Sequence, residues 1–584
     1  MFRGYYSFFN LYLLYLILGA IFRVAYSELF HNFDELHYII IYGLRMDTII
    51  FSVISIPALI LFIFRLNQTI KFYYALTISS LIVFEVVSVF YFSTFFQRPN
   101  YLLIEYMEYP EDVFNMIWDS FQINILMLIV IFPILVTLFY KMIEFEDKQR
   151  AIPTTILLIL LLIGARSSFS SSAPNPSFYN FSKSEISNEI ANNSLFSLAY
   201  DFYASKKDKS LNFGEIDDRI AVKNLQKLGR NGTLKSLHDK KEKILLIQLE
   251  SFGKDFVGIL GGEKMTPNID RWSKEGVLFS NMHSTGMRTN RGVEAIISSI
   301  PPSPSRTYLK RLKSQRDFWT VAEPLNRLGY RTVFLYGGDS KFDNMRSFLL
   351  SNGFNEIIDI YDFGGEEIYG WGVPDEVLLK RAEKILKESK KPIFLYTVTL
   401  TSHEPFLYPK GKIDINRRFS ENSFANSTKY TDFAVGKLLD SLDIDNMAIG
   451  LIGDHPPKVK SDRAIPVDSF QVFGLILGSI KGECSQLSSQ IDFIPTLLDV
   501  AGVSTDLPAF GVSLLQNRVD RAMMTYRKSF AYLKSDHFIL YQDGKKPRTF
   551  NLNYEEIEQN RDSIDDGLSY LNLSEYLYQK GDYK

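Results

Sequence analysis

The feature that most constrains this chain is a series of apolar stretches within its first 166 residues. Five can be distinguished, at about residues 5–22, 38–64, 72–96, 123–140 and 151–165. A helix needs about 20 mostly apolar residues to cross a bilayer. The last stretch is short and contains Pro153 near its start, but we count it as a span. The sequence therefore predicts a transmembrane domain of five helices at residues 1–166.

Charged residues between these stretches predict the orientation in the membrane. Basic residues such as Arg3, Arg65 and Lys141 lie on one side, and acidic residues such as Glu28 and Asp34 dominate the other. Because cytoplasmic loops carry an excess of Lys and Arg, the amino terminus is expected in the cytoplasm. An odd number of spans then places the rest of the chain outside it.

The composition of the remaining chain is that of a globular protein. Residues 1–150 contain 22 charged residues, whereas most of the 64 Lys and Arg and 66 Asp and Glu residues follow them. The net charge of −2 gives no reason to expect nucleic acid as a partner. Cys484 is the single cysteine, which excludes a disulfide framework and a cysteine zinc cluster.

The pattern beyond the membrane segments predicts an α/β fold. A Ser-rich run at 167–173 and a helix expected at 182–203, with Ser182 as its N-cap, form a stalk that we expect to pack on the globular part. Short apolar strands then alternate with helical runs, as in a mostly parallel sheet covered by helices. Residues 522–552 indicate a small antiparallel sheet. The predicted parts are a linker at 167–242, an α/β domain at 243–520, and a C-terminal subdomain and tail at 521–584.

Three polar residues follow two of the predicted strands. Glu250 ends the run KILLIQLE, and Asp454 and His455 follow the run MAIGLIG. In parallel sheets, ligands bind at the carboxyl ends of the strands. A mixed set of carboxylates and imidazole suits one divalent cation, Mn²⁺, Zn²⁺ or Mg²⁺. Taken singly, a Glu at a strand end is more often a cap or salt-bridge partner, and an Asp-His pair is more often a turn feature.

Thr289 lies between a turn at Gly286 and a predicted helix, which makes it a candidate N-cap. The same position can serve chemistry. A helix start attracts anions, and Arg288 and Arg291 place cations where a phosphate would bind. A threonine hydroxyl becomes a nucleophile when a metal lowers its pKa, and the carboxylates of Glu250 and Asp454 could hold such a metal.

The order Glu250, Thr289, Asp454-His455, with His403 in the segment TSHEPF, resembles the alkaline phosphatase/sulfatase superfamily. The resemblance is specifically to its membrane-bound branch of lipoteichoic acid synthases and phosphoglycerol transferases. It implies that Glu250, Thr289, Asp454 and His455 ligate one divalent ion, most often manganese. It also implies that Thr289 is the phosphorylated nucleophile, that His403 belongs to the phosphate site, and that Arg288 is the basic residue beside the nucleophile.

One segment departs from the lipoteichoic acid synthases. Their His and Trp-Asn-Arg group is replaced here by residues 336–345, YGGDSKFDNM, which are closer to relatives from Gram-negative bacteria. A different headgroup pocket is therefore expected. Asp339, Asp343 and Asn344 are candidates for contacts to substrate hydroxyl or amine groups, with helix capping as the alternative.

The resemblance implies an enzyme of the bacterial cytoplasmic (inner) membrane whose catalytic domain is periplasmic or extracellular. It would move a phosphoglycerol-type headgroup from phosphatidylglycerol, through phosphorylated Thr289, to a hydroxyl of a glycan or a glycerophosphate polymer. One alternative is phosphoethanolamine transfer to lipid A or another glycan, although such relatives typically carry several disulfides. The other alternative is a catalytically inactive membrane sensor or scaffold.

Overall fold

The chain forms two compact units, Met1–Lys207 and Asp208–Lys584, each of which is described by itself. The computed structural model describes residues 3–583 except 31–32, 96–97, 101–102, 104–109, 146–150, 169–172, 183, 207–212, 229–231, 458–460 and 462. Most of the predicted Ser-rich run therefore lies outside the described residues. The boundary between the units falls inside the linker predicted at 167–242, and the other predicted boundaries stay predictions.

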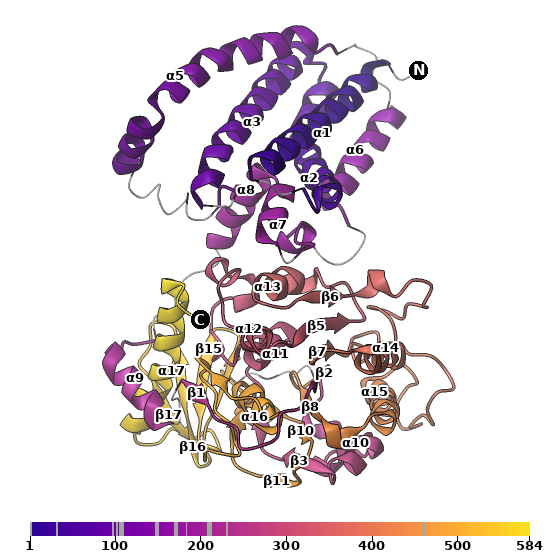
Figure 1. Ribbon diagram of the computed structural model, residues 1–584, viewed down its shortest axis with the longest axis vertical. Helices are drawn as coiled ribbons and strands as arrows, with labels where there is room; N and C mark the ends of the chain where they lie inside the picture. Colours follow the sequence, from indigo (N-terminus) through magenta and orange to yellow (C-terminus); the bar gives the residue numbers. More distant parts are fainter. Residues whose placement is uncertain are drawn as a thin grey trace. The chain divides into compact units, whose positions relative to one another are not determined.

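The first unit contains long apolar helices (Figure 1). They are α1 (Arg3–Leu29), α2 (Leu36–Ile63), α3 (Asn67–Phe95), α5 (Pro110–Met142) and α6 (Ala151–Arg166). Within the described residues, three segments are long and apolar enough to cross a membrane: Tyr5–Leu29 of α1, Leu36–Ile63 of α2 and Asn67–Ser93 of α3. The apolar helices Leu126–Met142 and Ile152–Arg166 are shorter. The prediction of five spans is therefore corrected to three candidate spans: the apolar part of α5, Leu126–Met142, and the apolar part of α6 are at most 17 residues long, or about 26 Å against a hydrocarbon core of about 30 Å.

The helix predicted at 182–203 is two helices, α7 (Glu185–Ala191) and α8 (Ser194–Ser205). The chain turns at Asn192 and Asn193, and the Asn193 side chain caps α8 by accepting from two backbone N–H groups. Ser184, not Ser182, caps α7. Within the first unit, α7 packs against α1 and α2, and α8 packs against α2 and α3. The expectation that this segment packs on the globular part stays a prediction.

Two buried arginines hold this hairpin against the long helices. Arg23 forms a bidentate pair with Asp47 and also donates to the carbonyls of residues 191 and 192. Arg98 pairs with Glu85 and donates to the carbonyls of residues 189 and 190. The last carbonyls of α7 thus obtain the partners that a helix end lacks.

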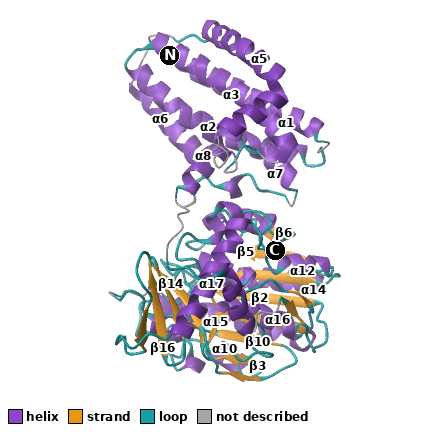
Figure 2. Ribbon diagram, turned by 90° about the vertical axis from the view of Figure 1, so that its left-hand side faces the viewer, coloured by secondary structure: helices purple, strands orange, loops and turns teal. Residues whose placement is uncertain are grey.

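The core of the second unit is a mostly parallel sheet (Figure 2). Its eight strands, counted in the described part of the chain, are in spatial order β11 (Gly482–Cys484), β3 (Gly276–Phe279), β10 (Gly474–Leu477), β8 (Met447–Gly453), β2 (Lys243–Leu249), β7 (Ile393–Val398), β5 (Arg331–Tyr336) and β6 (Glu356–Ile358). Only β10 runs antiparallel to its neighbours. The continuous apolar strands are buried on both faces, which confirms the predicted α/β fold.

Helices cover both faces of this sheet. Those that contribute to one core are α11 (Thr289–Ser298), α12 (Ala322–Arg327), α13 (Met345–Ser351) and α16 (Phe493–Val500), and those on the other are α10 (Pro267–Trp272), α14 (Asp375–Glu388) and α15 (Phe424–Ser441). Short pairings surround the sheet: β12 (Ser488–Ser489) with β4 (Met282–His283) and β9 (Gln471–Val472), and β1 (Thr233–Leu234) with β13 (Thr505–Asp506).

The C-terminal residues form the predicted antiparallel sheet, drawn in orange to yellow in Figure 1. Its strands are β14 (Ala522–Tyr526), β15 (Ser529–Leu533), β16 (His537–Gln542) and β17 (Arg548–Asn551). A helix, α17 (Arg561–Lys580), follows where the sequence indicated only a tail. It packs against α9 (Asp218–Lys227), and it buries Leu568, Tyr570 and Leu571 in the main core.

These contacts set the limits of a stable fragment. We expect residues 208–584 to fold as a soluble domain, because α9, β1 and α17 complete its core. A fragment of 243–516 should be destabilised by several kcal/mol, since each buried side chain lost from α17 contributes about 1.5–3 kcal/mol. Thermal unfolding and protease resistance of the two fragments check this. Equal stability would show that α9 and α17 are dispensable.

Candidate active site

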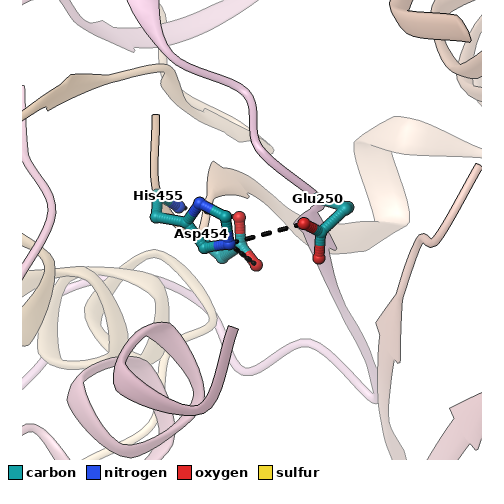
Figure 3. A group of neighbouring side chains, drawn as sticks. All are labelled: Glu250, Asp454 and His455. Atoms are coloured by element: carbon teal, nitrogen blue, oxygen red, sulfur yellow. Dashed lines mark hydrogen bonds and ion pairs between the residues drawn. The ribbon is translucent and has the colours of Figure 1, made fainter. Parts of the chain in front are cut away.

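The site begins with the register of two neighbouring strands. β2 and β8 pair in parallel, with Leu249 opposite Gly453. The next residues, Glu250 and Asp454, therefore leave the sheet side by side, as expected from the sequence. Figure 3 shows that the side chains of Glu250, Asp454 and His455 point toward one another. One ligand atom from each lies within 4.8 Å of the others, and all three residues are buried.

Asp454 is held so that one carboxylate oxygen stays available. Its Oδ1 accepts from the backbone N–H groups of Ser251 and His455, both at 2.7 Å. Its Oδ2 is buried and has no hydrogen-bond partner among the described residues. A buried charged acceptor without a donor is unfavourable by more than about 1–3 kcal/mol. This oxygen is therefore suited to bind a metal ion.

His455 is oriented for the same purpose. Its Nδ1 lies 2.7 Å from the Pro456 carbonyl, which fixes the proton on Nδ1 and leaves Nε2 as the basic nitrogen of the neutral ring. That nitrogen lies 3.4 Å from Glu250 Oε1 and 3.6 Å from Asp454 Oδ2. Two carboxylates and one imidazole thus offer the mixed O and N donors that suit a divalent cation.

Burial and charge act against each other in this cluster. Burial raises the pKa of Asp454 to about 7, and the Glu250 carboxylate adds to the increase. Burial also works against ionised Glu250, but His403 and His455 outweigh it and hold the pKa of Glu250 well below its ordinary value. Burial similarly disfavours a charged His455, yet Asp454 and Glu250 raise the pKa of its ring to about 9. Without a bound cation, the two buried carboxylates repel each other, and burial disfavours their charged forms.

Thr289 is brought to this cluster by the start of α11. The helix N-cap is Arg288, and Thr289 is the first helical residue, so the N-cap assignment of Thr289 is wrong. Its hydroxyl donates to Glu250 Oε2 at 3.0 Å. The helix can approach because Gly292 has no side chain: a Cβ there would lie 2.7 Å from Asp454 Cβ. The hydroxyl therefore faces the acidic cluster.

The two arginines of this segment differ in their surroundings. Arg291 donates to Glu294 at 2.8 Å and to the Ser305 carbonyl, so its guanidinium braces the loop after α11. Arg288 is exposed beside Thr289. It is the arginine that a phosphate at Thr289 could reach without breaking an ion pair.

His403 approaches one carboxylate oxygen of Glu250, and His455 approaches the other. Its Nε2 lies 3.3 Å from Glu250 Oε2, and burial, which lowers the pKa of this ring, is outweighed by the Glu250 charge, which raises it. The ring stacks on Trp371, with centroids 4.9 Å apart. Asp375 fixes the preceding loop by accepting from the backbone N–H groups of Leu400 and Thr401. Sequence reasoning missed Trp371 and Asp375, since neither belongs to a motif around His403.

Gln490 is a further positioning residue that the sequence gave no reason to select. Its amide nitrogen donates to the carbonyls of Gly453 and Asp454 at 2.7 and 2.8 Å. Its amide oxygen accepts from the Thr285 N–H at 2.9 Å. One side chain therefore ties the strand end that carries Asp454 to the turn that leads into Thr289.

The candidates from segment 336–345 lie near the same cluster. Burial raises the pKa of the Tyr336 hydroxyl well above its ordinary value, and the charges of Glu250, Asp343, Asp339 and Asp454 all add to this increase.

Their individual contacts differ. Asp343 accepts from Asn290, the neighbour of Thr289, at 2.7 Å. Asp339 accepts from the Lys341 N–H at 3.0 Å. Asn344 is buried, and its amide donates to the Leu309 carbonyl at 2.8 Å. Although it occupies the N-cap position of α13, its side chain makes no cap hydrogen bond, so the capping alternative is wrong for Asn344.

Comparison with known proteins agrees with this geometry. Residues 242–503 match the family model described as Sulfatase. The solved structure of a protein in the alkaline phosphatase superfamily from Vibrio parahaemolyticus is 31% identical, with a TM-score of 0.61, and the match covers 64% of this chain and 98% of that one. The chain belongs to the alkaline phosphatase superfamily.

Within this superfamily, the predicted resemblance to lipoteichoic acid synthases is also confirmed. The lipoteichoic acid synthase of Staphylococcus aureus (strain USA300) is 21% identical over 397 residues, or 59% of this chain. The match spans 61% of the length of that relative. The structure of the lipoteichoic acid synthase LtaP from Listeria monocytogenes shares the fold at 22% identity, with a TM-score of 0.53, over 61% of this chain and 98% of that one.

We expect Glu250→Gln and Asp454→Asn to weaken binding of Mn²⁺ to this superfamily member by about tenfold or more, since each removes one charged oxygen from the donor set. Metal content of the full chain after dialysis measures the loss. Glu275→Gln is the matched control, because Glu275 forms an exposed pair with Lys481. Wild-type stoichiometry and affinity in both site variants would rule out the cluster as the metal site.

Proposed function

We propose that this protein is a membrane-bound transferase that moves a phosphoglycerol-type headgroup from phosphatidylglycerol to an extracytoplasmic hydroxyl. The observation that carries the proposal is the hydrogen bond from the Thr289 hydroxyl to Glu250, inside a cluster with the donors for a divalent cation. The names of the relatives in Staphylococcus and Listeria support the choice of reaction.

Glu250, Asp454, His455 and the Thr289 hydroxyl would hold one divalent cation, with Mn²⁺ first and Mg²⁺ or Zn²⁺ as alternatives. Such a cation, when bound, lowers the pKa of a nearby hydroxyl and offsets charge on the phosphate. Arg288 would bind the phosphate oxygens from the open side of the site. His403, held against Trp371, would donate a hydrogen bond to the same group.

The reaction proceeds in two displacements at phosphorus. In the first, Thr289 Oγ1 bonds to phosphorus, the bond to the diacylglycerol oxygen breaks, and the threonine proton ends on that oxygen. In the second, the acceptor hydroxyl bonds to phosphorus, the bond to Oγ1 breaks, and the acceptor proton returns to Thr289. Atoms and charge balance over the two steps, and the net change is transfer of the headgroup.

The helices of the first unit give this chemistry its proposed location. Their apolar length suits a membrane, and the predicted orientation puts the amino terminus in the cytoplasm of a bacterium. The catalytic unit would then lie on the outer side of the cytoplasmic (inner) membrane. There it would meet a phospholipid donor, and a glycan or glycerophosphate polymer as acceptor.

We expect Thr289→Ala to lower release of diacylglycerol from phosphatidylglycerol vesicles by a factor of about 10³ or more, with the fold retained, because the variant lacks the attacking oxygen. Thr289→Ser is the matched control, since it keeps a hydroxyl and should retain measurable turnover. Peptide mass mapping of quenched wild-type enzyme should find a glycerophosphate adduct on the peptide that contains Thr289.

Near wild-type turnover by Thr289→Ala, without an adduct in the wild type, would refute this mechanism. An adduct with the mass of phosphoethanolamine, formed from phosphatidylethanolamine, would support the alternative headgroup. A wild-type protein that binds metal but acts on neither lipid would favour the inactive sensor or scaffold.

A further inference from the structure

The two acidic side chains of segment 336–345, Asp339 and Asp343, are each paired with a lysine. Asp343 forms an ion pair with Lys310, and Asp339 lies 3.3 Å from the Lys341 ammonium. These four side chains are largely but not fully buried, with exposed fractions of 27% for Lys310, 16% for Asp343, 9% for Lys341 and 13% for Asp339. The Lys310 pair adjoins the start of α11, because Asp343 accepts from Asn290, the neighbour of Thr289. The Lys341 pair adjoins the His403 side, because the ring of Phe342 lies 5.3 Å from that of Trp371, which stacks on His403.

The position of the Asp343 pair relative to the nucleophile is fixed by backbone geometry. Asp343 and its neighbour Asn344 both have left-handed conformations, with φ of 53° and 64°. Such backbone is unfavourable for these residues and persists where surrounding contacts enforce it. Here the contacts are the hydrogen bond from Asn290 to Asp343 and the bond from Asn344 to the Leu309 carbonyl.

The second pair is held by an aromatic ring. The Lys341 ammonium lies 4.2 Å from the centre of the Tyr361 ring, and the Tyr361 hydroxyl lies 3.3 Å from Asp339 Oδ2. Lys341 is thus bound to a carboxylate and to the face of a ring. Together the two pairs contribute two positive and two negative charges, and this part of the site is neutral overall.

We propose, on the basis of the function proposed above, that Lys310 and Lys341 are specificity-determining residues that select an uncharged polyol headgroup over an aminoalkyl headgroup. An ammonium group placed here would lose hydration and gain no net attraction, because each carboxylate already has a cation. A hydroxyl can donate to a carboxylate and accept from a lysine or from Asn290, so a glycerol group satisfies both kinds of partner.

The test uses the full chain and measures its activity on two lipids and its binding of two soluble headgroup phosphates. The variants are Lys310→Met, Lys341→Met and the double variant, with Lys387→Met on the exposed face of α14 as the matched control. Diacylglycerol release is measured from mixed vesicles of phosphatidylglycerol and phosphatidylethanolamine. Binding of sn-glycerol 1-phosphate and of O-phosphoethanolamine is measured by calorimetry with Mn²⁺ present. Thermal unfolding identifies any variant that fails to fold. If Lys310→Met does not fold, Lys310→Gln takes its place.

We expect wild type and Lys387→Met to prefer the glycerol compounds by about tenfold or more, and the double variant to reduce that preference by about tenfold, with tighter binding of O-phosphoethanolamine. An unchanged preference in a folded double variant would overturn the assignment. If wild type releases diacylglycerol from neither lipid, the proposed function fails. The binding ratio of the two soluble phosphates still decides the role of the lysines.

Discussion

The parallel pairing of β2 with β8 is the constraint on which the rest of the catalytic unit depends. Its register places Glu250 and Asp454 side by side at the carboxyl ends of two central strands. Two carboxylates so close and so deeply buried repel each other, and neither can be solvated. Backbone N–H groups stabilise the charge of Asp454, and His403 and His455 stabilise that of Glu250. The arrangement of donors also suits a divalent cation, which would offset the remaining repulsion.

Chain segments far apart in the sequence are brought to this edge by small, specific contacts. Gly292 lets α11 touch Asp454 directly, and Gln490 joins the carbonyl of Asp454 to the turn before Thr289. Asp375 anchors the loop that carries His403. The Thr289 hydroxyl is therefore positioned by contacts from several elements, which would limit the reorganisation that the proposed phosphoryl transfer requires.

Glu250, Asp454 and His455 could be predicted to meet because they follow apolar strands, and strand polarity in a parallel sheet dictates that such ends converge. The N-cap assignment of Thr289 failed because the cap lies one residue earlier: Arg288 has the extended backbone of an N-cap, and the Thr289 hydroxyl donates to Glu250. The break at Asn192 was missed because arginines distant in sequence stabilise it. Lys310 beside Asp343 had no local signal, since 33 residues separate them.

The contacts of Arg23 and Arg98 have a consequence for biosynthesis. Both guanidiniums complete their hydrogen bonds with carbonyls at residues 189–192, which emerge from the ribosome after every long apolar helix has been made. Arg23 in α1 and Arg98 after α3 are therefore synthesised before all of their final hydrogen-bond partners exist. Maturation of the first unit ends only when α7 and α8 dock, so assembly of the membrane part is completed by a segment that is not itself a candidate span.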